Sequence, residues 1–140
     1  MNGGVMGFFS RFKQKQEPEQ VAHLEGPGEF KIEIIGESLY QDNINDITGG
    51  KTEDGHRLKT DAILLYQYDN PHDNQAIAVT IKGKIVGHLD RKMARLFRGA
   101  MKKINLEGYS SVCKAIIVGG WDRGDGDEGH YGVRLDFPYK

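Results

Sequence analysis

Short runs of β-branched, aromatic and other apolar residues, separated by polar turns, cover most of this chain. Residues 30–36 and 131–137 alternate apolar and polar positions, as half-buried strands do. Other runs are more continuously apolar, which is typical of strands buried on both faces. Together the pattern predicts about six strands, at 30–36, 62–68, 76–81, 84–86, 112–118 and 131–137.

Two turns punctuate the middle of the chain. Residues 69–74 (DNPHDN) form a polar loop in which Pro71 fixes φ and the Asn and Asp side chains can bond their own backbone. Lys82-Gly83-Lys84 is a second turn, which makes a hairpin of the flanking runs. Nineteen Gly against four Pro also indicates many turns. The Pro, Asn and Asp residues of 69–74 therefore predict a tight and ordered loop.

Two helices are predicted between the strands. Ser38 and Gln41 form a Ser-x-x-Gln capping box before a short helix that ends at Gly49-Gly50. Asp90 can cap a second helix, from 91 to about 104. A step of 100° per residue groups the following apolar residues on one face of that helix: Met93, Leu96, Phe97, Ala100 and Ile104. Six strands with one or two helices predict a mainly β fold, a small barrel or sandwich.

The chain of 140 residues suits one domain with an additional tail. Residues 13–29 are polar and contain Pro and Gly, which predicts a linker. Residues 1–12 contain three Phe, with Arg11 and Lys13 beside them. A flexible tail would explain them, and so would a weak amphipathic anchor or a partner-binding peptide. We therefore assign residues 1–29 to a flexible N-terminal tail and linker, and 30–140 to the folded domain.

The second helix carries a stripe of cations opposite its predicted apolar face. The stripe comprises Arg91, Arg95, Arg98 and Lys102, and no acidic residue lies between 91 and 106. Surface helices usually mix signs to gain i,i+4 pairs. A solvated positive face or a stripe that faces phosphates would both explain the pattern. Because the formal net charge is −1, any affinity for nucleic acid must come from such local clustering.

Catalytic and metal-binding signatures are weak. The acidic loop 122–129 lacks the calcium-loop pattern and is better explained as a hairpin tip. No two His stand at metal-ligand spacing, and no phosphate-cradling or nucleophile motif occurs. The single Cys113 excludes an internal disulfide, which favours a reducing, cytoplasmic setting. We expect no enzyme, cofactor or metal, and no membrane span or secretory signal.

Two spaced segments carry a family resemblance. The run NPHDNQAIAV, followed by KIVGHLDRKMA, resembles the HIRAN domain, whose pattern is Asn-Pro-Tyr-Asp-x-Asn-Ala-Val/Ile and then Val-Gly-His/Tyr-Leu. GESLYQDN upstream and GGWDRGDGDEGHYGVRLD downstream are similar to short, stand-alone bacterial members. The resemblance covers about residues 30–137. It implies a small barrel similar to the oligonucleotide-binding fold.

The resemblance also implies a binding site for single-stranded DNA at a free 3′-hydroxyl end. By position, the family's stacking, hydroxyl-binding and phosphate-binding residues correspond to Ser38, Leu39, Tyr40, His72, Asp73, His88 and Arg91. Arg95 extends the phosphate contacts along the helix. Ser38 stands where the family has Arg, and Leu39 and His72 stand where it has Tyr. These departures favour a general nucleic-acid surface over strict recognition of the 3′ end.

The sequence therefore predicts a non-catalytic module that binds single-stranded DNA or DNA ends, in DNA repair or in processes linked to replication. Asp73 would accept a hydrogen bond from a sugar hydroxyl, and Arg91, Arg95 and His88 would contact phosphates. The alternative is a protein-interaction module without nucleic-acid binding, which recruits a partner through the barrel edge and the N-terminal tail.

Overall fold

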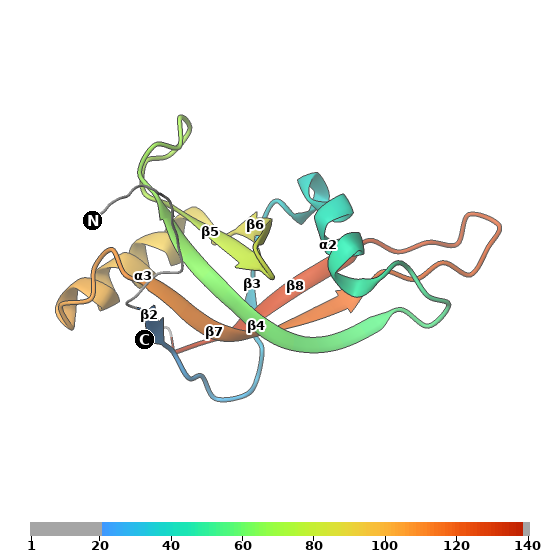
Figure 1. The fold of residues 1–140 in the computed structure, drawn as a ribbon, viewed down its shortest axis with the longest axis horizontal. Helices are drawn as coiled ribbons and strands as arrows, with labels where there is room; N and C mark the ends of the chain where they lie inside the picture. Colours follow the sequence, from blue (N-terminus) through green and yellow to red (C-terminus); the bar gives the residue numbers. More distant parts are fainter. Residues whose placement is uncertain (1–20, 139–140) are drawn as a thin grey trace, which may run out of the picture.

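The computed structural model describes residues 21–138, which form a mainly β fold (Figure 1). This part of the chain contains seven strands, two α-helices and one 3₁₀ helix. The strands are β2 (Val21–His23), β3 (Ile32–Glu33), β4 (His56–Gln67), β5 (Ala76–Ile81), β6 (Lys84–His88), β7 (Ser110–Gly119) and β8 (Tyr131–Asp136). The helices are η2 (Glu37–Leu39), α2 (Gln41–Thr48) and α3 (Arg91–Lys103).

All seven strands belong to one sheet that curls into a half-barrel, compatible with a small oligonucleotide-binding-like barrel. Its main path runs β3-β8-β7-β4-β5-β6, and β2 pairs with β7 in parallel beside this path. The two ends of the path meet through Ile35, just beyond β3, and His88 of β6. Ile35 N donates to His88 O at 2.8 Å, and His88 N donates to Ile35 O at 2.9 Å. This bridge places the residues after β3 beside the end of β6.

Residues 21–29 belong to the folded domain and not to a linker, so the predicted start of the domain at residue 30 lies too late. Ala22 is buried where β2 lies along β7. The carboxylate of Asp136 accepts hydrogen bonds from the backbone N–H groups of Gly28, Glu29 and Phe30 at 2.9–3.3 Å. The polar composition of this stretch therefore reflects an ordered loop. Residues 1–20 of the predicted tail and linker lie outside the described residues.

The first helix follows η2, but its predicted cap does not form. Tyr40 occupies the N-cap position of α2 and makes no side-chain capping bond there. Gln41 instead bonds across the molecule: its Nε2 donates to Glu37 O and Tyr131 O, and its Oε1 accepts from Tyr131 N at 2.8 Å. The side chain that suggested a local capping box therefore ties α2 to β8.

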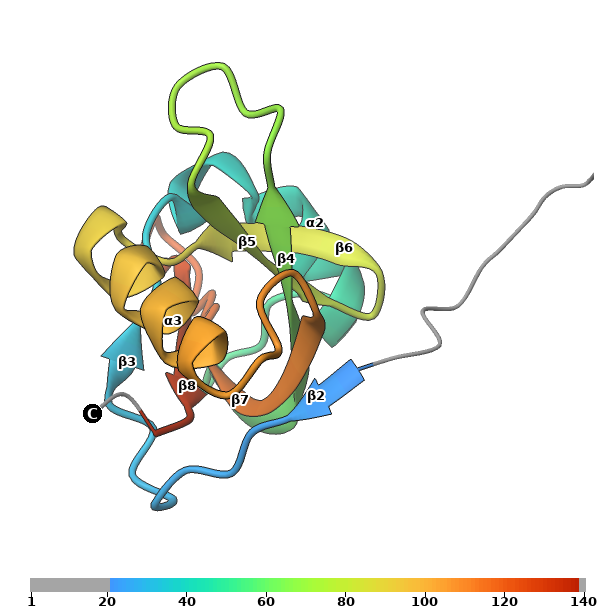
Figure 2. The same ribbon diagram turned by 90° about the vertical axis from the view of Figure 1, so that its left-hand side faces the viewer.

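The second helix begins where the sequence predicts, because Asp90 caps α3 through a bond from Met93 N to its carboxylate at 2.7 Å. The predicted apolar face is wrong for part of its length. The buried side chains are Ala94, Phe97, Arg98 and Met101. Phe97 packs against the rings of Tyr66 and Phe137. Helix α3 lies in front of the curled sheet in Figure 2. The face that it buries is rotated from the predicted apolar face, toward Arg98.

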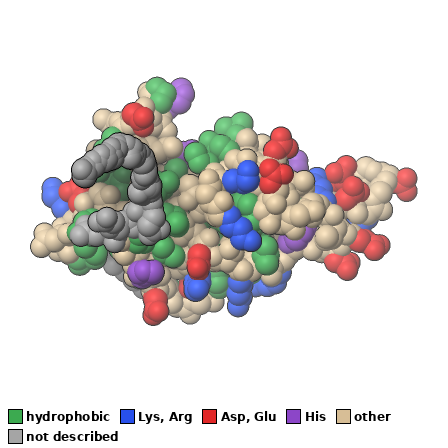
Figure 3. Space-filling model, in the orientation of Figure 1, with side chains coloured by type: hydrophobic (Ala, Val, Ile, Leu, Met, Phe, Trp, Pro, Cys, Tyr) green, Lys and Arg blue, Asp and Glu red, His purple; other side chains and the backbone are tan. Residues whose placement is uncertain are grey.

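The acidic loop after β7 projects at the end of the molecule opposite α3 (Figure 1). Acidic side chains gather at this same end in the space-filling view (Figure 3). Arg123 and Lys51 pair with Asp127 and Glu128 there. Within residues 21–138, no group of His, Cys, Asp and Glu is arranged to hold a metal ion. No helix in this range is long and apolar enough to cross a membrane.

Candidate nucleic-acid interface

The loop between β4 and β5 is built by its own side chains. Asn70 Oδ1 accepts hydrogen bonds from the backbone N–H groups of His72 at 2.8 Å and Asp73 at 3.2 Å. Asp73 Oδ1 accepts one from Gln75 N at 3.0 Å. Such Asx turns fix a loop without help from a neighbouring strand, as the Asn-Pro-His-Asp sequence predicts. The conformation of the loop is therefore fixed by hydrogen bonds within the loop itself.

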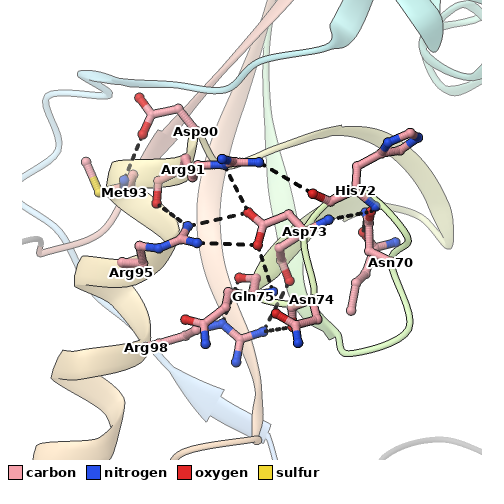
Figure 4. A network of polar contacts seen from close by, with 12 residues as sticks. Asn70, His72, Asp73, Asn74, Gln75, Asp90, Arg91, Met93, Arg95 and Arg98 are labelled. Carbon is pink, nitrogen blue, oxygen red and sulfur yellow. Dashed lines mark hydrogen bonds and ion pairs between the residues drawn. The ribbon is translucent and has the colours of Figure 1, made fainter.

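Helix α3 holds this loop from the side through Arg91 and Arg95 (Figure 4). Arg91 Nε lies 3.5 Å and Arg95 Nη1 lies 3.4 Å from Asp73 Oδ2. Arg91 Nη2 also donates to the carbonyl of His72 at 3.4 Å. The backbone N–H of Gln75, and then the two guanidinium groups, hold the pKa of Asp73 below its ordinary value. Asp73 is consequently a carboxylate anion, and it holds the guanidinium groups of Arg91 and Arg95 beside the loop.

Arg98 does not belong to the exposed basic stripe that the sequence predicts. Its side chain is only 9% exposed. Nε donates to Gln75 O at 2.7 Å, and Nη2 lies 3.4 Å from both Asn74 O and Ala76 O. These three carbonyls end the loop and begin β5, so Arg98 anchors the loop to α3 from below (Figure 4). Arg98 therefore positions the loop, and its guanidinium group is directed at protein carbonyls.

The hydrogen bonds fix the tautomer of His88. Because Asn70 Oδ1 accepts two backbone N–H groups, Asn70 Nδ2 faces Gln67 and donates to its Oε1 at 3.1 Å. The same Gln67 Oε1 lies 2.8 Å from His88 Nε2, which must therefore carry a proton. Neutral His88 then has Nδ1 as a hydrogen-bond acceptor, and protonated His88 has two donors. His88 can thus accept from a ligand hydroxyl or, when charged, donate to a phosphate.

Burial lowers the pKa of His88 from its ordinary value of 6.5. The unfolded chain therefore takes up this proton first on acidification, so the stability that neutral His88 contributes is full above that value and falls below it. The variant His88→Gln keeps a donor toward Gln67 and removes the titration. We expect the wild type to lose more stability than His88→Gln between about pH 7 and about pH 5 in urea denaturation. Equal losses would contradict this assignment.

Side chains of the β4–β5 loop, β6 and α3 meet in one shallow, open depression. Its lining residues are Ile35, Gly36, Asn70, His72, Asp73, Ala76, His88, Leu89 and Arg91. Thus the structure brings together four of the eight residues that the sequence singled out, from the loop, β6 and α3. A fifth, Arg95, adjoins them through Asp73.

The remaining three predicted residues lie at or beyond the edge of the depression. The Tyr40 ring centroid is 6.2 Å from that of His88. Ser38 and Leu39 lie in η2 and do not line the depression, and Leu39 is 80% exposed. Gln67, Asn70 and Arg98 were not predicted as site residues. The one sequence signal for Gln67 is a polar residue between Tyr66 and Tyr68 at the end of an apolar strand.

Compared with protein-family models, with curated proteins and with solved structures, the chain matches none. The geometry of the depression and the resemblance of the two motifs are therefore the observations from which a function can be inferred.

Proposed function

We propose that this domain binds single-stranded nucleic acid, in particular DNA or a DNA end, without catalysis of its own. The observation that carries the proposal is the convergence of Asp73, His88 and Arg91 on one depression. The two HIRAN-like motifs supply these residues, and we propose membership of that family on the same ground. A role in DNA repair or in processes linked to replication follows from the family resemblance alone.

The depression offers groups for both parts of a nucleotide backbone. A guanidinium has five N–H donors, and Arg91, whose side chain is 69% exposed, uses Nε and Nη2 within the protein. Its remaining donors suit a phosphate oxygen. Asp73 and His88 Nδ1 can accept from a sugar hydroxyl, since the arginine contacts to Asp73 are long and replaceable. Loops on a rigid sheet are common positions for such groups.

Salt dependence tests the backbone contacts. If about four phosphates are contacted on a single strand, log K falls with log salt at a slope of about −3. We expect this slope for a short oligonucleotide, measured by fluorescence anisotropy. A salt-insensitive affinity, or no binding below about 100 μM at low salt, would overturn the proposal.

The double variant Arg91→Ala with Arg95→Ala tests the position of the interface. Removing two phosphate contacts should weaken binding and reduce the magnitude of the salt slope by about 1.4. The control is Lys51→Ala with Arg123→Ala, which removes the same charge beside the acidic loop, away from α3. If both pairs bind alike, and their folds are intact by circular dichroism, the depression is not the interface.

One observation favours the alternative, a protein-interaction module. Leu96 and Ile104 are 48% and 58% exposed and line an apolar groove together with Leu24 and Phe137. Arg95 and Lys103 also line the groove, so a partner helix with an apolar face and acidic flanks would be complementary. This alternative predicts that Leu96→Ser abolishes binding of such a helix and leaves oligonucleotide affinity unchanged.

A further inference from the structure

Tyr68 is an aromatic residue whose exposure neither the depression nor the core explains. It follows β4 and is 62% exposed. Among the large exposed hydrophobic side chains of residues 21–138, it is the only aromatic one. Tyrosine is enriched at interfaces, because its ring is apolar and its hydroxyl group is polar.

The ring is nevertheless held in place from one side. It stacks on Tyr66, with ring centroids 5.7 Å apart and an angle of 21° between the planes. The guanidinium of Arg98 lies 4.7 Å from the Tyr66 centroid and 5.3 Å from the Tyr68 centroid. Arg98 is itself fixed by three carbonyls, and Tyr66 packs on Phe97. Tyr68 therefore presents a preorganised ring, which loses little freedom when a flat ligand stacks on it.

Helix α3, which carries Arg98, also connects Tyr68 with the depression. Arg91 lines the depression, and Arg98, seven residues later on the same helix, lies under Tyr68. Seven residues of α-helix span about 10 Å, which corresponds to about three stacked nucleotides at about 3.4 Å each. Lys102, one turn beyond Arg98, is exposed and adds a cation on the same side. A strand that is bound in the depression can thus extend along α3 to Tyr68.

We propose that Tyr68 is a stacking platform for an unpaired nucleobase, a second subsite a few nucleotides from the depression. The inference rests on the proposed function, because the depression would hold the strand that Tyr68 contacts. An exposed ring accepts the face of a base from a single strand, and such stacking tolerates any base. The arginine beneath the two rings adds a cation to the same stack. A role only in covering Tyr66 would not require a ring that is 62% exposed.

The test compares two oligonucleotides, a dinucleotide that reaches only the depression and an octamer that also reaches Tyr68. Tyr68→Ala should weaken octamer binding by about 5- to 100-fold, the loss of one stacked base, and leave dinucleotide binding unchanged. Tyr68→Phe keeps the stacking face and should bind the octamer within about twofold of the wild type. Leu58→Ala, which removes an exposed apolar side chain from β4, is the control and should bind both as the wild type does.

A second measurement does not depend on a truncated side chain. The one tryptophan, Trp121, lies beside the acidic loop, so Tyr68→Trp in a Trp121→Phe background reports on position 68 alone. Octamer binding should quench this fluorescence, and dinucleotide binding should not. Wild-type affinity of Tyr68→Ala for the octamer, or no quenching, overturns the platform while the depression stands. If the wild type binds neither oligonucleotide at low salt, the proposed function fails as well.

Discussion

Replacing Arg98 with alanine should lower the free energy of unfolding by about 3 kcal/mol. The substitution removes charge-assisted hydrogen bonds to the carbonyls of Gln75, Asn74 and Ala76, each worth about 1.5–3 kcal/mol when formed. It also removes the cation from beneath Tyr66, a contribution of about 1 kcal/mol. Because these contributions overlap, their sum is an upper limit.

Thermal denaturation would measure this effect as a fall in Tm of about 10 °C for a chain of this size. The control is Lys102→Ala, which removes a cation from the next turn, where the side chain is exposed, and should change stability by less than about 0.5 kcal/mol. Arg98→Lys should recover only part of the loss, because an ammonium cannot bridge three carbonyls while stacking on rings. Similar Tm values for Arg98→Ala and Lys102→Ala would show that the loop holds its shape without this anchor.

The fold class follows from local patterns. Runs of β-branched residues such as those in β5 and β7 specify strands, and the turn at Gly83 joins β5 to β6. Asp90 specifies the start of α3, because an N-cap acts within one turn of the chain. These signals are strong where the information is contained in neighbouring residues.

Elements that depend on distant partners could not be predicted in this way. Residues 21–23 lie in a polar stretch of sequence, and they form a strand only because the edge of β7 is available for pairing. The loop at 28–30 is ordered by Asp136, which lies more than a hundred residues away in the sequence. In α3, helical periodicity defines two possible stripes, but only tertiary contacts select the one that buries Arg98. A buried arginine is indistinguishable from an exposed one in the sequence.

The candidate site likewise contains residues that the sequence could indicate and residues that it could not. Motif resemblance indicated residues from the loop, β6 and α3, and the structure places His72, Asp73, His88 and Arg91 around one depression. Motif resemblance could not indicate Gln67, because the role of that side chain depends on the facing strand and loop. Gln67 fixes the proton of His88 only through its simultaneous bond with Asn70. Whether these groups bind a nucleotide remains the prediction that the oligonucleotide titrations test.

Gly87→Ala should displace Ile35, which lines the depression, away from β6. A Cβ at position 87 would lie 2.7 Å from the carbonyl oxygen of Ile35 and 2.7 Å from Cδ1 of Ile34. That carbonyl accepts the hydrogen bond from His88 N, so the strand after β3 must move away from β6. Strain and the two weakened bridge bonds together should cost about 2–3 kcal/mol. Because Ile35 and His88 both line the depression, the same shift should weaken oligonucleotide binding.

Gly99→Ala is the matched control, because a Cβ at position 99 meets nothing within 4 Å. Alanine favours an exposed helix interior over glycine, so this variant should gain about 0.5–1 kcal/mol and bind as the wild type does. Urea denaturation and octamer binding would measure both variants side by side. If Gly87→Ala is as stable as the wild type but binds weakly, the glycine acts on the ligand and not on the bridge. If it is destabilised yet binds normally, His88 and Ile35 do not shape the nucleotide site, and the function proposed for the depression loses its geometric basis.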